Sequence, residues 1–293
     1  MNWPKDLRDK VKEGEALKDK TTFRIGGCAR FFAEPENGRE LKDLLICARK
    51  NNLPVFILGS GSNILVNDKG VRGLVLRLNS PFFRKIKCQR NFIESASGVK
   101  IKELILKSYN NGLSGFEFLA GIPGTTAGAL AMNAGSWGRS IGELAEEVKV
   151  MDYSGREKLI KKKGIRFGYR NSSLSKYIIL GARFKLNKEK KAKIKENISG
   201  FLARRFQMQD LSFPNAGCIF RNPPQEHAGR LIDLCGLKGK KAGGAVISSK
   251  HGNFILNKGQ ASCSDVLSLM NLAKKKVKKK FNISLAPEIK IWR

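Results

Sequence analysis

Apolar residues along the chain are spaced as in helices in some segments and as in strands in others. Apolar residues recur at three- and four-residue intervals from Leu41 to Ala48, which predicts an amphipathic helix over residues 38–51. Other helices are expected at 100–111, about 188–206, about 226–235 and 264–280. Short apolar runs predict strands at 55–58, 73–78, 92–96, 148–152, 177–186 and 253–256, with an edge strand at 287–292. This order predicts an α+β protein in which helices dominate after about residue 187.

One segment, residues 121–138, interrupts this pattern with small residues. Twelve of its eighteen residues are Gly, Ala, Ser or Thr, and Gly124 followed by Thr125 and Thr126 predicts a loop that leads into a helix. Free N–H groups at a helix start bind phosphate, and glycine lets a ligand approach the backbone closely. Tight packing of a helix in a core explains the same composition, so both interpretations stand at this point.

A second small-residue loop, Gly59-Ser-Gly-Ser-Asn63, follows the predicted strand at 55–58 directly. Ile64 stands where a dinucleotide-binding fingerprint has its third glycine, and neither small-residue segment contains the Gly-Lys-Ser/Thr of a P-loop. A plain turn and a backbone nest for an anion remain open. Two such loops in one half of the chain would suit a diphosphate held between them, and a flavin dinucleotide is one such ligand.

Three further positions carry groups suited to chemistry. Arg170, beside Tyr169, either offers two parallel donors to a carboxylate or is simply exposed in a turn. Cys218, in the loop Pro214–Pro223, has a thiol whose ordinary pKa of about 8.5 suits proton donation to a developing carbanion, although most free cysteines are small buried hydrophobes. Glu288 lies among apolar neighbours, as a surface carboxylate or as an acid whose pKa is raised by burial.

The composition is that of a globular protein with a large excess of positive charge. The 293 residues are 41% hydrophobic, and 56 Lys and Arg against 25 Asp and Glu give a net charge of +31. No zinc-finger spacing or aromatic RNA-binding strand accompanies the lysines, so we interpret them as solvated surface and expect no nucleic-acid partner. Six cysteines without a Cys-x-x-Cys pair, and only two histidines, argue against a metal site.

Targeting and membrane segments are not expected. The N-terminus carries charges throughout and has no apolar stretch of the kind found in a signal peptide. Residues 118–138 are uncharged and long enough to cross a bilayer, but five glycines and one proline argue against a span. We therefore expect a cytoplasmic protein without membrane insertion.

Nine short runs, taken in order, resemble the UDP-N-acetylenolpyruvoylglucosamine reductase family (UDP-N-acetylmuramate dehydrogenases) of peptidoglycan synthesis. Each run is weak alone, but their order is specific and they cover nearly the whole chain. The runs are Thr22–Gly27, Gly59–Asn63, 121–138, Tyr169–Ser172, Pro214–Pro223, Ala228–Ile232, Gly236–Gly239, His251–Phe254 and Leu285–Glu288.

The resemblance implies a fold and a domain organisation. The expected fold is the FAD-binding fold of the vanillyl-alcohol-oxidase type, with subdomains over residues 1–79 and 80–187. A smaller α+β substrate-binding domain is expected over 188–288, and residues 289–293 are expected to return to the first subdomain. The short spacing after Arg170 resembles the family branch that lacks an extra substrate-closing loop. We expect a monomer.

The resemblance also implies a reaction. NADPH would reduce FAD, and the enolpyruvyl ether of UDP-N-acetylglucosamine would then take a hydride at its methylene carbon. Arg170 and Glu288 match the residues that polarise the substrate carboxylate, and Cys218 matches the proton donor to the other carbon. Tyr169, Asn215 and Arg221 match positions that hold the substrate. The positions expected to hold FAD are Gly59, Ser60, Gly61, Ser62, Asn63, Gly121, Gly124, Thr125, Thr126, Gly128, Ala129, Asn133 and Gly135.

The chain departs from the family pattern in three places. The proton donor of the family is most often serine, and a thiol at Cys218 keeps the role while being more easily oxidised. Gln209-Asp210 stands where the family commonly has Gln-Pro, and Trp292-Arg293 stand where it often ends in glycine. We expect the last two departures to change local geometry and to leave activity intact.

Overall fold

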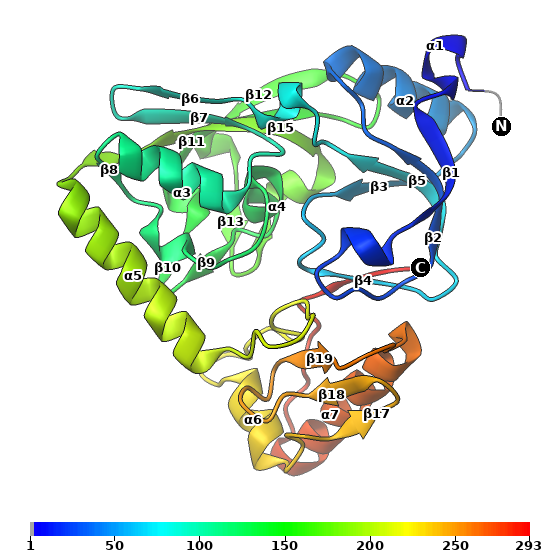
Figure 1. Cartoon of the computed structure of the whole chain (residues 1–293), viewed down its shortest axis with the longest axis vertical. Coiled ribbons are helices and arrows are strands. Elements are labelled where there is room, and N and C mark those ends of the chain that lie inside the picture. The colour runs from blue at the N-terminus through cyan, green and yellow to red at the C-terminus, as the bar shows by residue number, and fades with distance from the viewer. Residues whose placement is uncertain (1–2) are drawn as a thin grey trace. The chain divides into compact units, whose positions relative to one another are not determined.

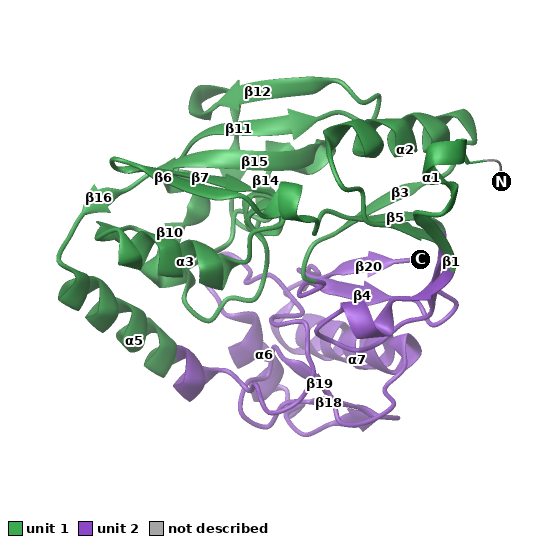
Figure 2. Ribbon diagram, turned by 45° about the horizontal axis from the view of Figure 1, so that its top comes forward, with its two compact units in different colours: residues 1–13, 31–60, 73–204 green, residues 14–30, 61–72, 205–293 purple. Residues whose placement is uncertain are grey.

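Residues 3–293 are described by a computed structural model, and the chain divides into two compact units (Figures 1 and 2). The first unit is made of the described residues up to Glu13, Phe31–Ser60 and Gly73–Arg204. The second unit is made of Gly14–Arg30, Gly61–Arg72 and Arg205–Arg293.

A five-stranded antiparallel sheet forms one half of the first unit. Its strand order is β12-β11-β15-β7-β6, and α3 and α4 pack on it (Figure 1). The elements are β6 (Ile86–Gln89), β7 (Phe92–Ala96), α3 (Ile101–Asn110), α4 (Thr126–Ala131), β11 (Ala145–Met151), β12 (Glu157–Lys161) and β15 (Ile178–Lys185). The predicted strands at 92–96, 148–152 and 177–186 and the helix at 100–111 are confirmed. The two outer strands, β6 and β12, have no fully buried residue, and they lack the apolar run that would have predicted them.

A four-stranded sheet of order β1-β2-β5-β3 and the helix α2 form the next layer of the fold. The elements are α1 (Lys5–Arg8), β1 (Val11–Ala16), β2 (Cys28–Ala33), α2 (Gly38–Lys50), β3 (Val55–Leu58) and β5 (Val71–Arg77). The predicted apolar face of α2 is buried, and Asn37 caps the helix by accepting the Glu40 N–H at 3.0 Å. The strand β3 runs parallel to β5, so the loop after β3 leaves at the carboxyl end of a parallel pair.

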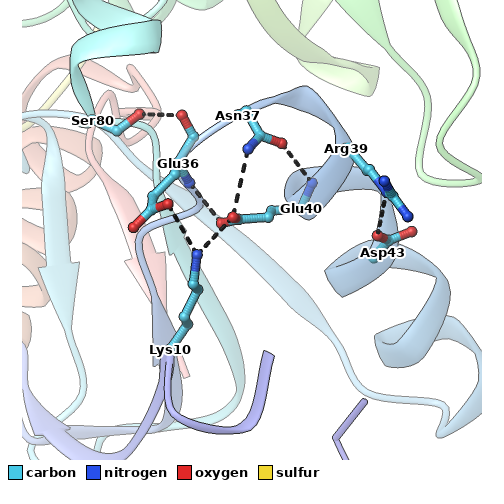
Figure 3. A network of polar contacts seen from close by, with 7 residues as sticks. All are labelled: Lys10, Glu36, Asn37, Arg39, Glu40, Asp43 and Ser80. Atoms are coloured by element: carbon cyan, nitrogen blue, oxygen red, sulfur yellow. Dashed lines mark hydrogen bonds and ion pairs between the residues drawn. The ribbon is translucent and has the colours of Figure 1, made fainter. Parts of the chain in front are cut away.

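A polar network ties the start of α2 to two distant parts of the first unit (Figure 3). Lys10 Nζ lies 2.7 Å from Glu40 Oε1 and 3.0 Å from Glu36 Oε2, and Ser80 Oγ donates to the Glu36 carbonyl at 2.9 Å. Hydrogen bonds to Glu40 and then Glu36 raise the pKa of Lys10. Burial acts to raise the pKa of Glu40, but hydrogen bonds from the Glu36 N–H and from Lys10 hold it below its usual range.

The second unit contains a three-stranded antiparallel sheet and two helices. The helix α7 packs against β18 and α6. The elements are α6 (Ala228–Leu234), β17 (Lys241–Ala242), β18 (Ala245–Ile247), β19 (Ile255–Asn257) and α7 (Cys263–Phe281). The helices expected at about 226–235 and 264–280 are confirmed as α6 and α7, and the strand expected at 253–256 is β19. The expectation of a single short strand here was wrong, because β17 and β18 are too short to show a period of two. A parallel pair of β4 (Ile64–Val66) and β20 (Lys290–Trp292) completes the unit.

Short pairs of strands and one long helix connect these elements. The helix is α5 (Lys191–Met208), which matches the expected helix over about 188–206. The pairs are β8 (Leu113–Ser114) with β16 (Asn187–Lys188), β9 (Gly135–Ser136) with β10 (Arg139–Ser140), and β13 (Phe167–Gly168) with β14 (Asn171–Ser172). Within residues 3–293, no helix combines the length and the apolar character needed to cross a bilayer.

Candidate active site

The small-residue loop Gly59–Asn63 begins where β3 ends, as expected. Gly61 has a φ of +64°, and a Cβ there would lie 2.4 Å from the carbonyl oxygen of Lys20, so only glycine fits. The Gly61 carbonyl accepts a hydrogen bond from the Thr22 N–H at 3.2 Å. The glycine is therefore required where the loop backbone approaches residues 20–22.

The far end of this loop is tied to the C-terminal segment. Asn63 Nδ2 donates to the Glu288 carbonyl at 3.3 Å, and the Asn63 carbonyl accepts the Lys290 N–H at 2.9 Å. From there β4 continues in parallel with β20. The structure thus brings Asn63, a predicted flavin-binding residue, against the backbone of Glu288, a predicted catalytic residue.

The segment 121–138 contributes both buried and exposed residues at the start of α4. Thr126 is fully buried with its hydroxyl 2.7 Å from that of Ser95, and Ala129 is buried too. Thr125 is the N-cap of α4 and accepts the Gly128 N–H at 3.2 Å. Gly128 is exposed, and the nearest atom to a Cβ built there is Thr125 Oγ1 at 3.5 Å. One face of the segment belongs to the core, and the face at Gly128 is exposed.

The two small-residue segments meet at Gly59 and Thr125. A Cβ on Gly59 would lie 2.9 Å from Thr125 Oγ1, closer than a side chain tolerates. Gly121 and Gly124 precede this contact: Gly121 has a φ of +77°, and the Gly124 carbonyl accepts the Ile101 N–H at 3.0 Å. A ligand held between two loops requires them to lie side by side in this way.

Two other predicted flavin-binding residues are used by the protein's own packing. Asn133 has a φ of +44°, donates Nδ2 to the Gly168 carbonyl at 3.0 Å and accepts the Gly142 N–H at 3.0 Å. A Cβ on Gly135 would lie 2.1 Å from the Arg139 carbonyl oxygen. The side chain of Asn133 therefore holds the β13–β14 hairpin, and Gly135 allows the tight β9–β10 hairpin.

Tyr169 and Arg170 form the two-residue turn between β13 and β14. Arg170 has a φ of +53°, a left-handed conformation in which glycine or asparagine normally stands. Arg170 Nη1 donates to the Gly135 carbonyl at 2.8 Å, and the guanidinium lies 5.3 Å from the centre of the Tyr169 ring. Such strained residues persist where the surroundings hold them, and they cluster at functional sites.

The segment around Cys218 lies beside the segment that carries Glu288. Phe220 and Pro287 are paired in an antiparallel bridge, and the Glu288 N–H donates to the Ile219 carbonyl at 2.8 Å. Both Cys218 and Glu288 are partly buried. The predicted proton donor and the predicted acid thus stand on neighbouring extended segments of the second unit, whereas Arg170 belongs to the first unit.

Two predicted substrate-binding residues flank Cys218. Asn215 Oδ1 accepts the Gly217 N–H at 2.9 Å, its Nδ2 donates to the Phe213 carbonyl at 2.9 Å, and its carbonyl accepts the Thr22 hydroxyl at 2.7 Å. Asn215 therefore shapes the loop. Arg221 keeps a buried Nε for which the described residues provide no hydrogen-bond acceptor.

Asp210, which stands where the family commonly has proline, takes part in a local hydrogen-bond network. Asp210 Oδ2 accepts the Ser248 hydroxyl at 2.7 Å. Burial acts to raise the pKa of Asp210, but hydrogen bonds from Ser212 and Ser248 hold it below its usual range. The Ser248 oxygen also accepts the His251 N–H at 3.1 Å, and burial lowers the pKa of the His251 ring. A proline at position 210 would constrain this turn through its ring. Asp210 constrains the turn through hydrogen bonds instead.

Sequence reasoning missed Ser97, which lies just beyond β7 and beside α4. Its carbonyl accepts the Ala127 N–H at 3.1 Å, and its buried hydroxyl has no hydrogen-bond partner anywhere in residues 3–293. A single serine after a strand has no distinguishing pattern, so only the structure reveals it.

Comparisons with known proteins identify related sequences and structures. Residues 29–181 match the model of an FAD binding domain, and residues 208–292 match the C-terminal domain of UDP-N-acetylenolpyruvoylglucosamine reductase. The reductase of Moorella thermoacetica is 40% identical over 98% of this chain and 94% of its own length. That of Clostridium novyi is 37% identical over 97% of this chain and 92% of its own length. The crystal structure of the Thermus caldophilus reductase has a TM-score of 0.83 at 35% identity, covering 97% of this chain and 98% of that one. The expected α+β class and FAD-binding fold are confirmed.

Proposed function

Because the chain belongs to the UDP-N-acetylenolpyruvoylglucosamine reductase family, we propose that it reduces this enolpyruvyl sugar nucleotide to UDP-N-acetylmuramate. The reductant is NADPH, and FAD is the bound cofactor. The product is a precursor of peptidoglycan.

The observation that carries this proposal is the pairing of the Cys218 and Glu288 segments. The hydrogen bond from the Glu288 N–H to the Ile219 carbonyl, at 2.8 Å, fixes a thiol and a carboxyl group on adjacent segments. A reductase that protonates a carbanion next to a carboxylate needs both groups, whereas a simple alcohol oxidase needs neither.

The residues present fit FAD. Gly59 and Gly61 are sites where added side chains would collide with Thr125 and Lys20, so the loop Gly59–Asn63 keeps bare backbone at both positions. The buried, unsatisfied hydroxyl of Ser97 adds a hydrogen-bonding group beside α4, within the part of the chain that is described. We assign the pyrophosphate to the backbone of these two loops. When bound, FAD supplies hydride transfer between NADPH and the substrate.

The residues of the chain supply electrostatics and a proton. Hydride addition at the methylene carbon leaves negative charge on the neighbouring carbon and the attached carboxylate. Arg170 stabilises that charge, and Glu288 in its neutral form donates a hydrogen bond to it. Cys218 Sγ–H transfers its proton to the carbon next to the carboxylate, which forms the C–H bond and leaves a thiolate that takes a proton from water.

Substrate binding falls to residues beside these groups. The unsatisfied Nε of Arg221 favours an anionic ligand, for which the diphosphate of the UDP moiety is suited. The exposed ring of Tyr169 presents an apolar face and a hydroxyl next to Arg170. Asn215 contributes through the loop that its side chain closes.

The remaining expectations are part of the same proposal. We propose subdomains at 1–79 and 80–187, a substrate domain at 188–288, and a monomeric enzyme in the cytoplasm that binds no nucleic acid. Hydrophobic clusters around Leu44, Val148 and Val266 form three packing centres, although the Leu44 cluster includes Met151 and the Val266 cluster includes Phe23 and Leu65. A sedimentation-velocity run at physiological salt, with and without RNA, tests the monomer and the absence of nucleic-acid binding.

Reconstitution and turnover test the proposed function. Protein mixed with FAD and then freed of unbound FAD should remain yellow. It should oxidise NADPH continuously only when UDP-N-acetylenolpyruvoylglucosamine is present, with UDP-N-acetylmuramate as the product. Protein that is colourless after unbound FAD is removed, or continuous NADPH oxidation whose rate does not depend on the sugar nucleotide, would contradict the proposal.

A further inference from the structure

Asn253 is a buried polar residue just before β19. Both the oxygen and the nitrogen of its side-chain amide form hydrogen bonds with the backbone of one residue, Phe220. Asn253 is 2% exposed. Its Oδ1 accepts the Phe220 N–H at 2.9 Å, and its Nδ2 donates to the Phe220 carbonyl at 2.7 Å. A side chain that binds both backbone groups of one residue does what a neighbouring strand would do.

Phe220 needs this partner because of its pairing with Pro287. On that side the hydrogen bonds run from the Arg221 N–H to the Ala286 carbonyl at 2.9 Å and from the Glu288 N–H to the Ile219 carbonyl at 2.8 Å. Phe220 is therefore the non-hydrogen-bonded member of the bridge, and its own N–H and C=O point to the opposite side. There the amide of Asn253 satisfies them.

The backbone of Asn253 binds the residue before Phe220 as well. The Ile219 N–H donates to the Asn253 carbonyl at 2.9 Å, and Cys218 pairs with Phe254 in an antiparallel bridge. Asn253 thus holds the two consecutive residues that separate Cys218 from Arg221. The segment is fixed on one side by the Glu288 segment and on the other by Asn253, through its side-chain amide and its carbonyl group, and by the bridge to Phe254.

We propose that Asn253 is the positioning residue that sets the place of the Cys218 thiol and of Arg221 during reduction of the sugar nucleotide. The inference rests on the proposed proton-donor role of Cys218. Proton transfer in an active site depends on placement, and a shift of about 1 Å can cost about 100-fold in rate. Asn253 acts through the backbone of Ile219 and Phe220 and is not proposed to touch a reacting atom.

Two substitutions separate positioning from general stability. Asn253→Ala removes both hydrogen bonds and leaves a buried N–H and C=O unsatisfied. Asn253→Asp keeps the shape. In its neutral form the new carboxyl group both accepts and donates, whereas its charged form cannot donate and places negative charge against the Phe220 carbonyl. Its burial raises the pH at which the neutral form appears.

Asn257 provides a matched control at the other end of β19. It is 8% exposed, its Nδ2 donates to the Phe23 carbonyl at 3.1 Å, and its Oδ1 accepts the Gly259 N–H at 3.1 Å. Its side chain makes a similar set of backbone hydrogen bonds in the same unit without bonding the segment from Cys218 to Arg221. Asn257→Asp therefore brings comparable destabilisation without the predicted effect on proton delivery.

The experiment measures the two half-reactions of the FAD-loaded variants separately by stopped-flow absorbance, from about pH 8 to about pH 5.5, each relative to the wild-type enzyme at the same pH. For Asn253→Ala and for Asn253→Asp at high pH, we expect flavin reduction by NADPH within about twofold of wild type and reoxidation by the sugar nucleotide about 30- to 100-fold slower. For Asn253→Asp, reoxidation should recover as the pH falls. Asn257→Asp should show no such recovery and near wild-type reoxidation.

Two results would overturn the inference. One is reoxidation by Asn253→Asp that stays as slow as that of Asn253→Ala at every pH. The other is a parallel loss of NADPH reduction in both Asn253 variants, which a general structural role would produce. A Cys218→Ala variant measured alongside keeps the two proposals distinct. If it reoxidises normally, the donor assignment fails. If it does not and the Asn253 variants do, only the positioning role fails.

Discussion

The contact between Gly59 and Thr125 makes a quantitative prediction about the two loops assigned to the cofactor. A Cβ on Gly59 would lie 2.9 Å from Thr125 Oγ1, while the Thr125 Cγ2 and Cβ atoms would remain at ordinary distances of 3.7 and 3.9 Å. The added methyl group must therefore displace Oγ1, which accepts the Gly128 N–H at 3.2 Å as the N-cap of α4. Loss of such a cap costs about 1 kcal/mol.

A second effect of Gly59→Ala opposes the loss of the cap, so the sign of the change in unfolding free energy can be predicted. The φ of Gly59 lies outside the left-handed region, so alanine fits the backbone and stabilises by about 0.5 kcal/mol through the unfolded chain. Gly59→Ala should then destabilise the wild-type apoprotein by about 0.5 kcal/mol, the difference of the two terms. In a Thr125→Ala background the cap is already absent, and the same change should stabilise by about 0.5 kcal/mol.

Urea denaturation of the four apoproteins completes this double-mutant cycle, and flavin fluorescence titration gives their FAD affinities. The expected coupling is about 1 kcal/mol, with weaker FAD binding in Gly59→Ala. Gly138→Ala is the control: its φ is +78° and nothing lies within 4 Å of a Cβ there, so it should cost about 1 kcal/mol in both backgrounds. Equal effects of Gly59→Ala in both backgrounds would refute the contact.

Three further predictions follow from the site and the fold. Cys218→Ser should keep turnover within about tenfold and survive a peroxide treatment that inactivates the wild type, because a hydroxyl donates a proton but does not oxidise; equal peroxide sensitivity would argue against oxidation at Cys218. Arg170→Gly relieves the left-handed strain of φ +53° and loses one hydrogen bond. Its unfolding free energy should stay within about 1 kcal/mol of wild type while turnover falls about 100-fold or more, and retained turnover would contradict the role of Arg170. Burial acts to raise the pKa of Glu40, but hydrogen bonds from the Glu36 N–H and from Lys10 lower it in the folded state, so the ionised carboxylate stabilises the fold above the unfolded pKa. This stabilisation is lost as the pH falls through the folded value. Urea midpoints of wild type and Glu40→Gln should therefore differ at pH 7 and converge in acid, and a constant difference would exclude the linkage.

The long periodic elements could be predicted from the sequence, and the short ones could not. The helices α2 and α7 and the strand β15 carry enough turns or alternations for their burial pattern to be visible. The strands β6 and β12 are exposed sheet edges, and β17 has two residues, so their existence depends on partners elsewhere in the chain. Tertiary pairing, which a local pattern does not contain, decides them.

The candidate site divides in the same way. The composition of the two small-residue segments is enough to predict their loops. The turn at Tyr169-Arg170 also lies where its motif predicts. What composition does not reveal is which backbone each residue touches: the need for glycine at position 61 comes from Lys20. Likewise, the side chain of Asn133 holds a hairpin more than thirty residues away, at Gly168. Such roles arise only when distant segments meet.

We propose that this chain reduces the enolpyruvyl sugar nucleotide in two separable steps, with Cys218 delivering the proton of the second. Anaerobic mixing of the FAD-loaded enzyme with NADPH, followed by UDP-N-acetylenolpyruvoylglucosamine, tests this proposal by flavin absorbance. NADPH should bleach the wild type and Cys218→Ala equally, and the sugar nucleotide should restore the yellow colour rapidly only in the wild type. Rapid restoration in Cys218→Ala, or no restoration in the wild type, would contradict it.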